Sequence, residues 1–186
     1  MVYPIFLYGS PVLRKVAKEI DKSYPRLREF IDSMFETMQK SEGLGLAAPQ
    51  VGESIRLFVI NGAPLAEDDE TMRDFKKTFI NGQIIERTGE DVVYNEGCLS
   101  LPGIREEIIR KSNVRITYYD ENFQFHDEEY DGLKARVIQH EYDHTDGILL
   151  IDHLPSLKRK LLRRKLTDIS KGIVDVRYKT KAPKTS

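Results

Sequence analysis

The most informative segment of the chain is Gln139-His140-Glu141-Tyr142-Asp143-His144, which holds two of its four histidines. On a helix, residues four apart lie on one face, so the imidazoles of His140 and His144 can reach the same metal ion. Glu141 follows the first histidine, where its carboxylate can hydrogen-bond a water at the metal without being a ligand. The pattern predicts a metal-dependent hydrolytic site. A surface helix with two solvated histidines is the alternative.

A catalytic metal with tetrahedral geometry needs a third protein ligand and keeps one position open for water. Downstream, Asp146, Asp152 and His153 do not form the longer three-histidine pattern of some zinc proteases. Upstream lies the segment Glu96-Gly-Cys-Leu-Ser-Leu-Pro102, which contains Cys98, the only cysteine of the chain. A metal would bind this side chain as a thiolate. A lone cysteine can equally be a small buried hydrophobic residue.

Three helices are expected. The first spans about Pro25–Lys40, where apolar residues recur at spacings of three and four. The second opens at Asp131-Gly132, carries the two histidines and ends near Gly147. The third begins after Pro155 and runs to about Ser170.

Strands are expected between the first two helices. The apolar or alternating runs that predict them are Ile55–Ile60, Thr78–Glu86, Arg105–Arg110, Val114–Tyr119 and Phe123–Tyr130. The glycine-rich Gly43–Gln50 is not expected to be helical, and the acidic Ala63–Asp74 is expected to be an exposed loop. Because helices and strands are segregated along the chain, the fold class is α+β. We expect a single domain of mostly antiparallel strands around a central metal-binding helix, with an N-terminal and a C-terminal helix.

The length of 186 residues fits one domain. We assign residues 1–172 to a catalytic domain and 173–186 to a C-terminal tail without a motif, for which disorder is one interpretation. From Leu154 onward the chain carries eleven Lys and Arg against two Asp, whereas the remainder carries 18 basic and 28 acidic residues. A basic end on an acidic body suggests an anionic partner. A solvated helix face is the alternative.

No apolar run approaches the roughly 18 to 20 residues that cross a bilayer. The first residues, Met1–Ile5, lack the basic and apolar regions of a secretory signal. We therefore expect a cytoplasmic protein without a membrane partner, and nothing in the sequence predicts specific DNA binding.

Three segments together resemble the signature motifs of the peptide deformylase family, in order and at appropriate separations: Gly43-Leu-Gly-Leu-Ala-Ala-Pro-Gln50, Glu96-Gly-Cys-Leu-Ser100 and Gln139-His-Glu-Tyr-Asp-His144. The expected third helix is similar to that of the subgroup with a carboxyl-terminal helix. The resemblance implies a metal-dependent amide hydrolase of protein biosynthesis. Such an enzyme removes the N-formyl group from the initiator methionine of nascent polypeptides and releases formate, so N-formylmethionyl peptides are the expected substrates.

The resemblance also implies the role of each motif residue. Glu141 would take a proton from the attacking water and later deliver it to the leaving amine. The Gln50 side-chain amide and the Leu99 backbone N–H would stabilise the negative charge on the formyl oxygen. One divalent ion is expected per chain, Fe²⁺ in cells, although the ligands also suit Zn²⁺, Ni²⁺ or Co²⁺. Its ligands would be Cys98, His140 and His144.

Further residues are expected around this centre. The peptide cleft, including an apolar wall for the methionine side chain, is assigned to Gly43, Leu44, Gly45, Gly97, Arg105, Leu133 and Val137. Behind the metal, Glu96 would pair with Arg110 to brace the cysteine loop, and Asp143 would orient a ligating imidazole. Ordinary surface charges are the alternative for these three.

Two other functions stay open. One is a zinc endopeptidase that uses the same His-Glu-x-x-His segment. The other is a structural zinc module closed by Cys98, His140, His144 and His153. Release of formate from a formyl-Met peptide would separate all three functions.

The expected third helix offers a binding surface. Four basic residues would share one face: Arg159, Lys160, Arg163 and Arg164. Leu162, Leu166 and Ile169 lie on another side and can dock the helix onto the body. An exposed basic face suits phosphate contacts without sequence preference, so we expect the ribosome as a partner.

Overall fold

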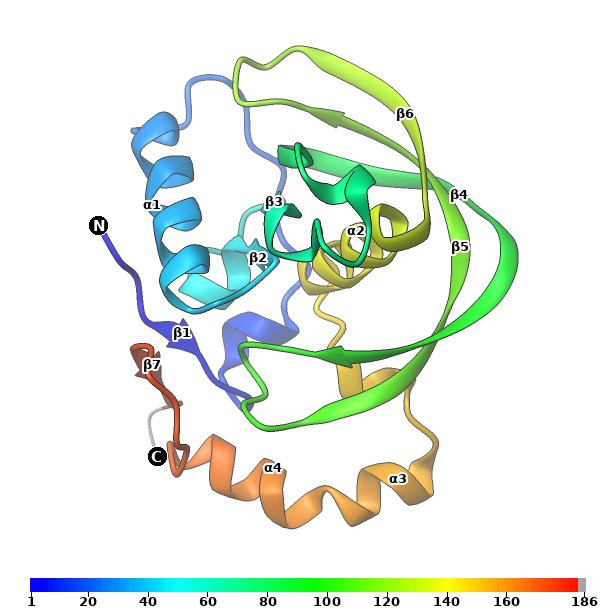
Figure 1. Cartoon of the computed structure of the whole chain (residues 1–186). Helices are drawn as coiled ribbons and strands as arrows, with labels where there is room; N and C mark the ends of the chain where they lie inside the picture. Colours follow the sequence, from blue (N-terminus) through cyan, green and yellow to red (C-terminus); the bar gives the residue numbers. More distant parts are fainter. Residues whose placement is uncertain (184–186) are drawn as a thin grey trace.

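One helix, α2 (Gly132–Thr145), runs through the centre of the molecule, and a curved antiparallel sheet surrounds it (Figure 1). The computed structural model describes residues 1–183. The sheet has the strand order β2 (Gly45–Ala47), β3 (Leu57–Asn61), β4 (Lys76–Gly97), β5 (Arg105–Tyr119) and β6 (Phe125–Asp131). All its neighbours pair in the antiparallel sense. The expected α+β fold around a central helix is confirmed.

The helix α2 is buried on nearly every side. Its apolar residues Ala135, Ile138 and Tyr142 pack in one core cluster with Phe58 of β3 and Ile116 of β5. Its polar residues are mostly buried as well: Arg136, Gln139, Glu141, Asp143 and His144. Buried polar groups need partners inside the protein. The polar face of α2 is therefore built into a site and does not face solvent.

The strands β4 and β5 are longer than expected. The strand expected to end at Glu86 continues to Gly97, and the two segments expected over 105–110 and 114–119 form one strand. Residues 85–95 are exposed, so no hydrophobic alternation marks this part of β4. Three register shifts interrupt the β4–β5 pairing. Such bulges bend strands, and the pair curves around α2 (Figure 1).

A second core cluster lies under the helix α1 (Leu27–Lys40). Phe30, Met34 and Met38 of this helix pack against Leu57 and Val59 of β3. The expected spacing of apolar residues therefore corresponds to a buried stripe. The short strand β2 lies in the same cluster through Leu46, so α1 and β3 together hold the glycine-rich segment in place.

The segment Ala63–Asp74 contains two 3₁₀ turns, η3 (Ala63–Leu65) and η4 (Glu70–Met72). Most of it is exposed, as expected, but Met72 is fully buried in the core cluster around α2. Met72 and the partly buried Leu65, which packs against the same cluster, anchor the loop.

The C-terminal part contains two short helices where one was expected. These are α3 (Ser156–Leu161) and α4 (Arg163–Ser170), which meet at Leu162. Leu166 and Ile169 are buried in a third cluster, and Leu162 is half-buried beside them.

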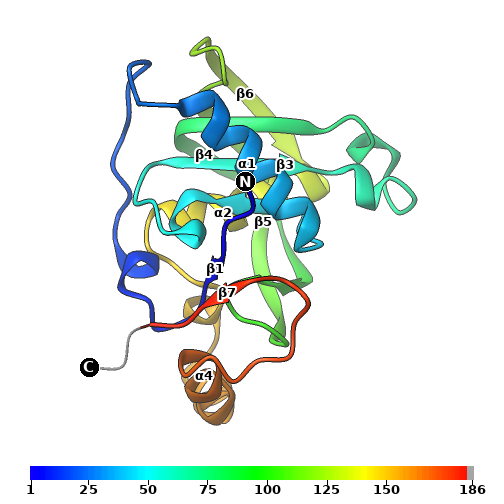
Figure 2. The same cartoon turned by 90° about the vertical axis from the view of Figure 1, so that its left-hand side faces the viewer.

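The chain then turns back, and β7 (Thr180–Lys181) pairs in parallel with β1 (Ile5–Phe6) (Figure 2). Residues 173–183, for which disorder was one interpretation, thus have a defined place against the body, because this pairing holds them. Residues 184–186 of that segment lie outside the described residues, and the division at residue 172 stays a prediction. Within residues 1–183, no helix has both the length and the apolar character needed to cross a bilayer.

Candidate active site

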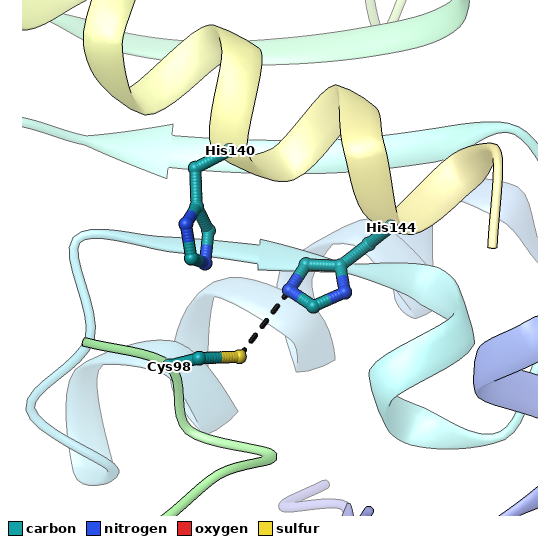
Figure 3. A group of neighbouring side chains, drawn as sticks. All are labelled: Cys98, His140 and His144. Atoms are coloured by element: carbon teal, nitrogen blue, oxygen red, sulfur yellow. Dashed lines mark hydrogen bonds between the residues drawn. The ribbon is translucent and has the colours of Figure 1, made fainter. Parts of the chain in front are cut away.

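Three side chains of the types that ligate metals meet between α2 and the loop that follows β4 (Figure 3). The ligand atoms of Cys98, His140 and His144 lie within 4.8 Å of one another, and Cys98 Sγ is 3.4 Å from His144 Nε2. Burial would raise the pKa of the Cys98 thiol, but His144 and His140 lower it to about 5, which favours the thiolate. One thiolate and two imidazoles form a donor set that fits a divalent transition metal. These residues could therefore hold one metal ion.

The carboxylate of Glu96 fixes the ring of His140. Its Oε2 accepts a hydrogen bond from His140 Nδ1 at 2.9 Å, which leaves Nε2 of that ring for a metal. Arg110 donates to both oxygens of Glu96, at 2.7 and 3.0 Å. Burial would raise the pKa of Glu96, but its hydrogen bonds with His140 and Arg110 hold it well below the usual value. A charged carboxylate thus stands behind the first imidazole.

Asp143 has different partners from the one expected. We expected it to orient a ligating imidazole, but its Oδ2 accepts from Arg110 Nη1 and from His153 Nε2, each at 2.7 Å. Asp143 faces β5, where Arg110 binds its carboxylate, so Glu96 makes the contact with the ligating imidazole. His153 is likewise absent from the group of metal-ligating atoms found among residues 1–183. A zinc site closed by His153 is therefore not what the structure shows.

Glu141 is only 4% exposed and lies against β2. A Cβ at Gly45 would come within 2.5 Å of its Oε1, so the carboxyl group packs directly on the backbone of Gly45. Burial raises the pKa of Glu141 to about 7, although His140 and His144 act in the opposite direction. At neutral pH such a group can both accept and donate a proton. In the described part of the chain, Oε2 of Glu141 has no hydrogen-bond partner.

Gln50 faces the cysteine loop from the other side. Its Oε1 accepts the backbone N–H of Ala47 at 2.9 Å, which turns the amide nitrogen toward the metal-ligating residues. That nitrogen lies 3.7 Å from Cys98 Sγ and 3.3 Å from Ser100 Oγ. The backbone N–H of Leu99 donates to no protein acceptor among residues 1–183. Two hydrogen-bond donors thus lie beside the three potential ligands.

A cavity of about 530 Å³ opens next to these donors. The expected residues that line it are Gly43, Leu44, Gly45, Gln50, Glu96, Gly97, Cys98, Leu99, Arg105, Val137, His140 and Glu141. Leu133 does not line this cavity, because it lies at the start of α2 and packs against the core cluster. Arg110, Asp143 and His144 are buried behind the cavity wall.

Some residues of the site were not anticipated. Arg136 donates to Glu96 Oε1 at 2.9 Å and lies one helical turn before His140. Its spacing of four on the same helix could have indicated it. Val176 and Tyr178 also line the cavity. They come from the C-terminal segment, and no local pattern marks them.

The arrangement defines a class of protein. A buried helix presents one imidazole and a carboxyl group to a cleft, and a second imidazole behind the cleft wall and a thiol complete a three-residue group that could hold a metal. A carboxyl group that can accept a proton beside a metal site is the combination of groups found in metallohydrolases.

Comparison with known proteins identifies the family. The family model described as polypeptide deformylase matches residues 2–160. The peptide deformylase of Christiangramia forsetii is 52% identical and covers 98% of this chain and 97% of its own length. That of Cytophaga hutchinsonii is 50% identical and covers 98% of both. The chain belongs to the polypeptide deformylase family.

Solved structures agree with this assignment. The peptide deformylase from Legionella pneumophila superposes with a TM-score of 0.80 at 34% identity, covering 93% of this chain and 98% of its own. The enzyme from Thermotoga maritima has a TM-score of 0.75 at 40% identity and covers 83% of this chain and 99% of its own. The family removes the N-formyl group from nascent peptides in protein biosynthesis, and this chain is a hydrolase of that kind.

Proposed function

We propose that this chain removes the formyl group from N-formylmethionyl peptides with Glu141 as the acid–base group and with Cys98, His140 and His144 as metal ligands. The observation that carries the proposal is the position of Glu141. Its buried carboxyl group lies next to the metal-ligating side chains and lines the cavity, and one of its oxygens has no partner within residues 1–183.

Each step of hydrolysis has a residue to perform it. Cys98, His140 and His144 would hold a divalent ion, and that ion would supply the Lewis acidity that makes a bound water and the formyl carbonyl reactive. Glu141 accepts a proton from the attacking water and then delivers it to the departing amine. As the formyl carbon becomes tetrahedral, its oxygen gains negative charge. Gln50 Nε2 and the Leu99 N–H donate hydrogen bonds to that oxygen.

The peptide would bind along the two loops that line the cavity. Gly43 and Gly45 allow close approach of a substrate backbone, and Gly97 lies opposite them at the end of β4. An extended peptide can then pair with these backbones as an added strand. Leu44 and Val137 offer an apolar surface to the methionine side chain.

The test is formate release from a short formyl-Met peptide, with metal content measured on the same sample. Glu141→Ala should keep its metal while turnover falls by roughly 10² to 10⁴. Cys98→Ser should bind metal more weakly, because a hydroxyl stays protonated where a thiol ionises. Glu107→Ala, which changes an exposed carboxylate, is the control. Loss of metal from Glu141→Ala, or full activity of Cys98→Ser, would contradict these roles.

The resident ion is a separate part of the proposal. The ligand set suits Fe²⁺, Zn²⁺, Ni²⁺ and Co²⁺. We take Fe²⁺ to be the ion in cells, as the family resemblance implies. A ferrous ion beside a thiolate is sensitive to oxygen, since both can be oxidised. Elemental analysis after anaerobic purification should find iron, and activity should decline on exposure to air. Full zinc occupancy in that sample would exclude Fe²⁺.

We further propose that the enzyme works in the cytoplasm, close to the ribosome. The side chains of Arg159, Lys160, Arg163 and Arg164 are exposed on α3 and α4, and Leu166 and Ile169 fix α4 to the body. Exposed guanidinium and ammonium groups bind RNA phosphates with little sequence preference. This supports a contact with the ribosome, whose surface is largely RNA.

Reversing these four charges to Glu should abolish salt-sensitive cosedimentation with ribosomes. Turnover of a short formyl-Met peptide should stay within about twofold of the wild type, because the basic residues lie outside the catalytic cavity. A reversal at four other exposed basic residues should leave cosedimentation intact: Lys15, Lys18, Lys22 and Arg28. Binding that survives the first reversal would refute the proposal.

A further inference from the structure

The C-terminal segment reaches the active site although none of the three motifs includes it. Tyr178 donates a hydrogen bond from its hydroxyl to the carbonyl oxygen of Leu99 at 2.9 Å. Tyr178 and Val176 line the same cavity as Leu99 and Glu141. The side chains of Tyr178 and Leu99 also pack against the core cluster under α1. The C-terminal segment is therefore a wall of the catalytic cleft.

The cysteine loop is held at three successive carbonyl groups. The carbonyl of Cys98 accepts from Leu101 N–H at 2.9 Å, within the loop itself. The carbonyl of Leu99 accepts from Tyr178, and that of Ser100 accepts from the N–H of Tyr8 at 3.0 Å. Two of the three donors thus come from the two terminal segments of the chain.

These two segments also hold each other. Ile5 N–H donates to Lys179 O at 2.8 Å, Leu7 N–H donates to Lys181 O at 2.9 Å, and β1 pairs with β7 between them. Figure 2 shows the two strands side by side. We call residues 5–8 and 178–181 the terminal clamp. Because its two halves are hydrogen-bonded to each other, the clamp and the cysteine loop (residues 98–104) are held together by hydrogen bonds from both halves, to Leu99 O and Ser100 O.

The clamp restrains the backbone of Leu99 on the side that the loop itself leaves free. The Leu99 N–H shares a planar peptide unit with the Cys98 carbonyl, which Leu101 holds, and Tyr178 holds the next peptide unit through Leu99 O. With both units held, rotation about the backbone bonds of Leu99 is restricted, and its N–H keeps one direction. That N–H has no protein acceptor in the described part of the chain, and Leu99 lines the cavity. We propose that Tyr178 is a positioning residue for hydrolysis: its hydrogen bond to Leu99 O aims the Leu99 N–H at the formyl oxygen. This inference rests on the proposed role of Leu99 as an oxyanion donor.

The test is Tyr178→Phe in the full-length, metal-loaded enzyme. The phenyl ring keeps the cleft wall and removes only the hydrogen bond. We expect kcat for a short formyl-Met peptide to fall roughly 3- to 10-fold, while KM, metal content and Tm stay near wild type. The Leu99 N–H stabilises charge that develops in the transition state and not in the bound substrate. An N–H that points less directly at the oxygen therefore lowers kcat and leaves KM unchanged.

Tyr119→Phe is the matched control, because Tyr119 packs against the same core cluster but contacts the rings of Phe123 and Phe125 and does not line the cavity. It should leave kcat unchanged. A Tyr178→Phe enzyme with wild-type kcat, with a higher KM alone, or with a lower Tm and unchanged kcat would overturn the inference. The Glu141→Ala result tests the proposed function separately. If that variant loses turnover and Tyr178→Phe does not, only the role of Tyr178 fails.

Discussion

Gly45 makes the position of Glu141 possible. The residue is buried in β2, where it pairs with Ile60 of β3. A Cβ at this position would lie 2.5 Å from Oε1 and 2.6 Å from Cγ of Glu141. Real Cβ atoms do not approach other atoms so closely, and Glu141 is held from behind by the buried helix α2. The absence of a side chain at Gly45 is therefore a packing requirement of the Glu141 carboxyl group.

Gly45→Ala should displace Glu141 without touching a proposed metal ligand. We expect kcat to fall roughly 10- to 100-fold with metal content unchanged, because a shift of about 1 Å in a reacting group has an effect of this size. Formate release and metal analysis on one sample measure both. Gly82→Ala is the control, since a Cβ there would meet its nearest neighbours at an ordinary 3.4 Å. Equal activity of the two variants would show that Glu141 tolerates the extra methyl group.

Among elements, β5 connects α2 to the end of β4, just before the loop that carries Cys98. Its residue Arg110 donates to Glu96 at the end of β4 and to Asp143 on α2. All three side chains are at most 10% exposed. Removing the guanidinium would leave the buried Asp143 without its arginine and Glu96 with Arg136 as its one remaining arginine partner, which is far more costly than losing a surface ion pair.

Arg110→Met should therefore lower the free energy of unfolding by about 3 to 5 kcal/mol. For a chain of this size the loss corresponds to a drop in Tm on the order of 10 °C, measurable by calorimetry. Arg115→Met is the matched control on the same strand. Arg115 makes a two-contact ion pair with Asp127, but their side chains are 46% and 35% exposed, so the expected loss is under about 1 kcal/mol. Similar losses in both variants would argue against the bracing role of Arg110.

The elements differ in how far sequence could predict them. The sequence predicts α1 because its apolar residues follow the helical period and pack on one core cluster. It predicts α2, which is buried on nearly every side, because helix-start residues and a histidine pair at a spacing of four mark it. The second half of β4 was missed because both of its faces meet water, so no alternation appears. The break at Leu162 between α3 and α4 was missed because apolar residues continue through it at helical spacing. Hydrophobic pattern thus predicts α1, which buries one face, and gives no signal for the second half of β4, which buries neither.

In the site, too, the sequence indicates some residues and not their partners. Cys98, His140 and Glu141 lie in short motifs, so their types and spacing indicate their chemistry. The partners that hold them depend on which strands meet in space. Asp143 binds Arg110 and not a ligating imidazole, a choice that sequence spacing does not determine. Tyr178 is the extreme case, since it is brought to Leu99 only by the pairing of the two terminal segments.

At the scale of the whole molecule, one network joins three strands far from the active site. Glu128 on β6 accepts from Lys77 of β4 at 2.9 Å and from the Tyr118 hydroxyl of β5 at 2.6 Å. The hydroxyl of Tyr130 also donates to it. Burial would raise the pKa of Glu128, but the hydrogen bonds from Tyr118, Tyr130 and Lys77 lower it from 4.5 to about 2. The folded state therefore favours the ionised carboxylate.

This shift makes stability depend on acidity in a defined window. Because the pKa is lower in the folded than in the unfolded chain, the stabilisation by Glu128 is complete above about pH 4.5 and is lost as the pH falls toward about 2. Its side chain is 35% exposed, so solvent screening reduces the contribution to on the order of 1 kcal/mol.

In urea unfolding, Glu128→Gln should be less stable than wild type by about this amount at about pH 6, and by less than half of it at about pH 3. The exposed neighbour gives the control, Glu129→Gln, which should match wild type at both values. A Glu128→Gln deficit that is the same at both values would mean that the network stabilises the sheet through packing and not through the ionised carboxylate.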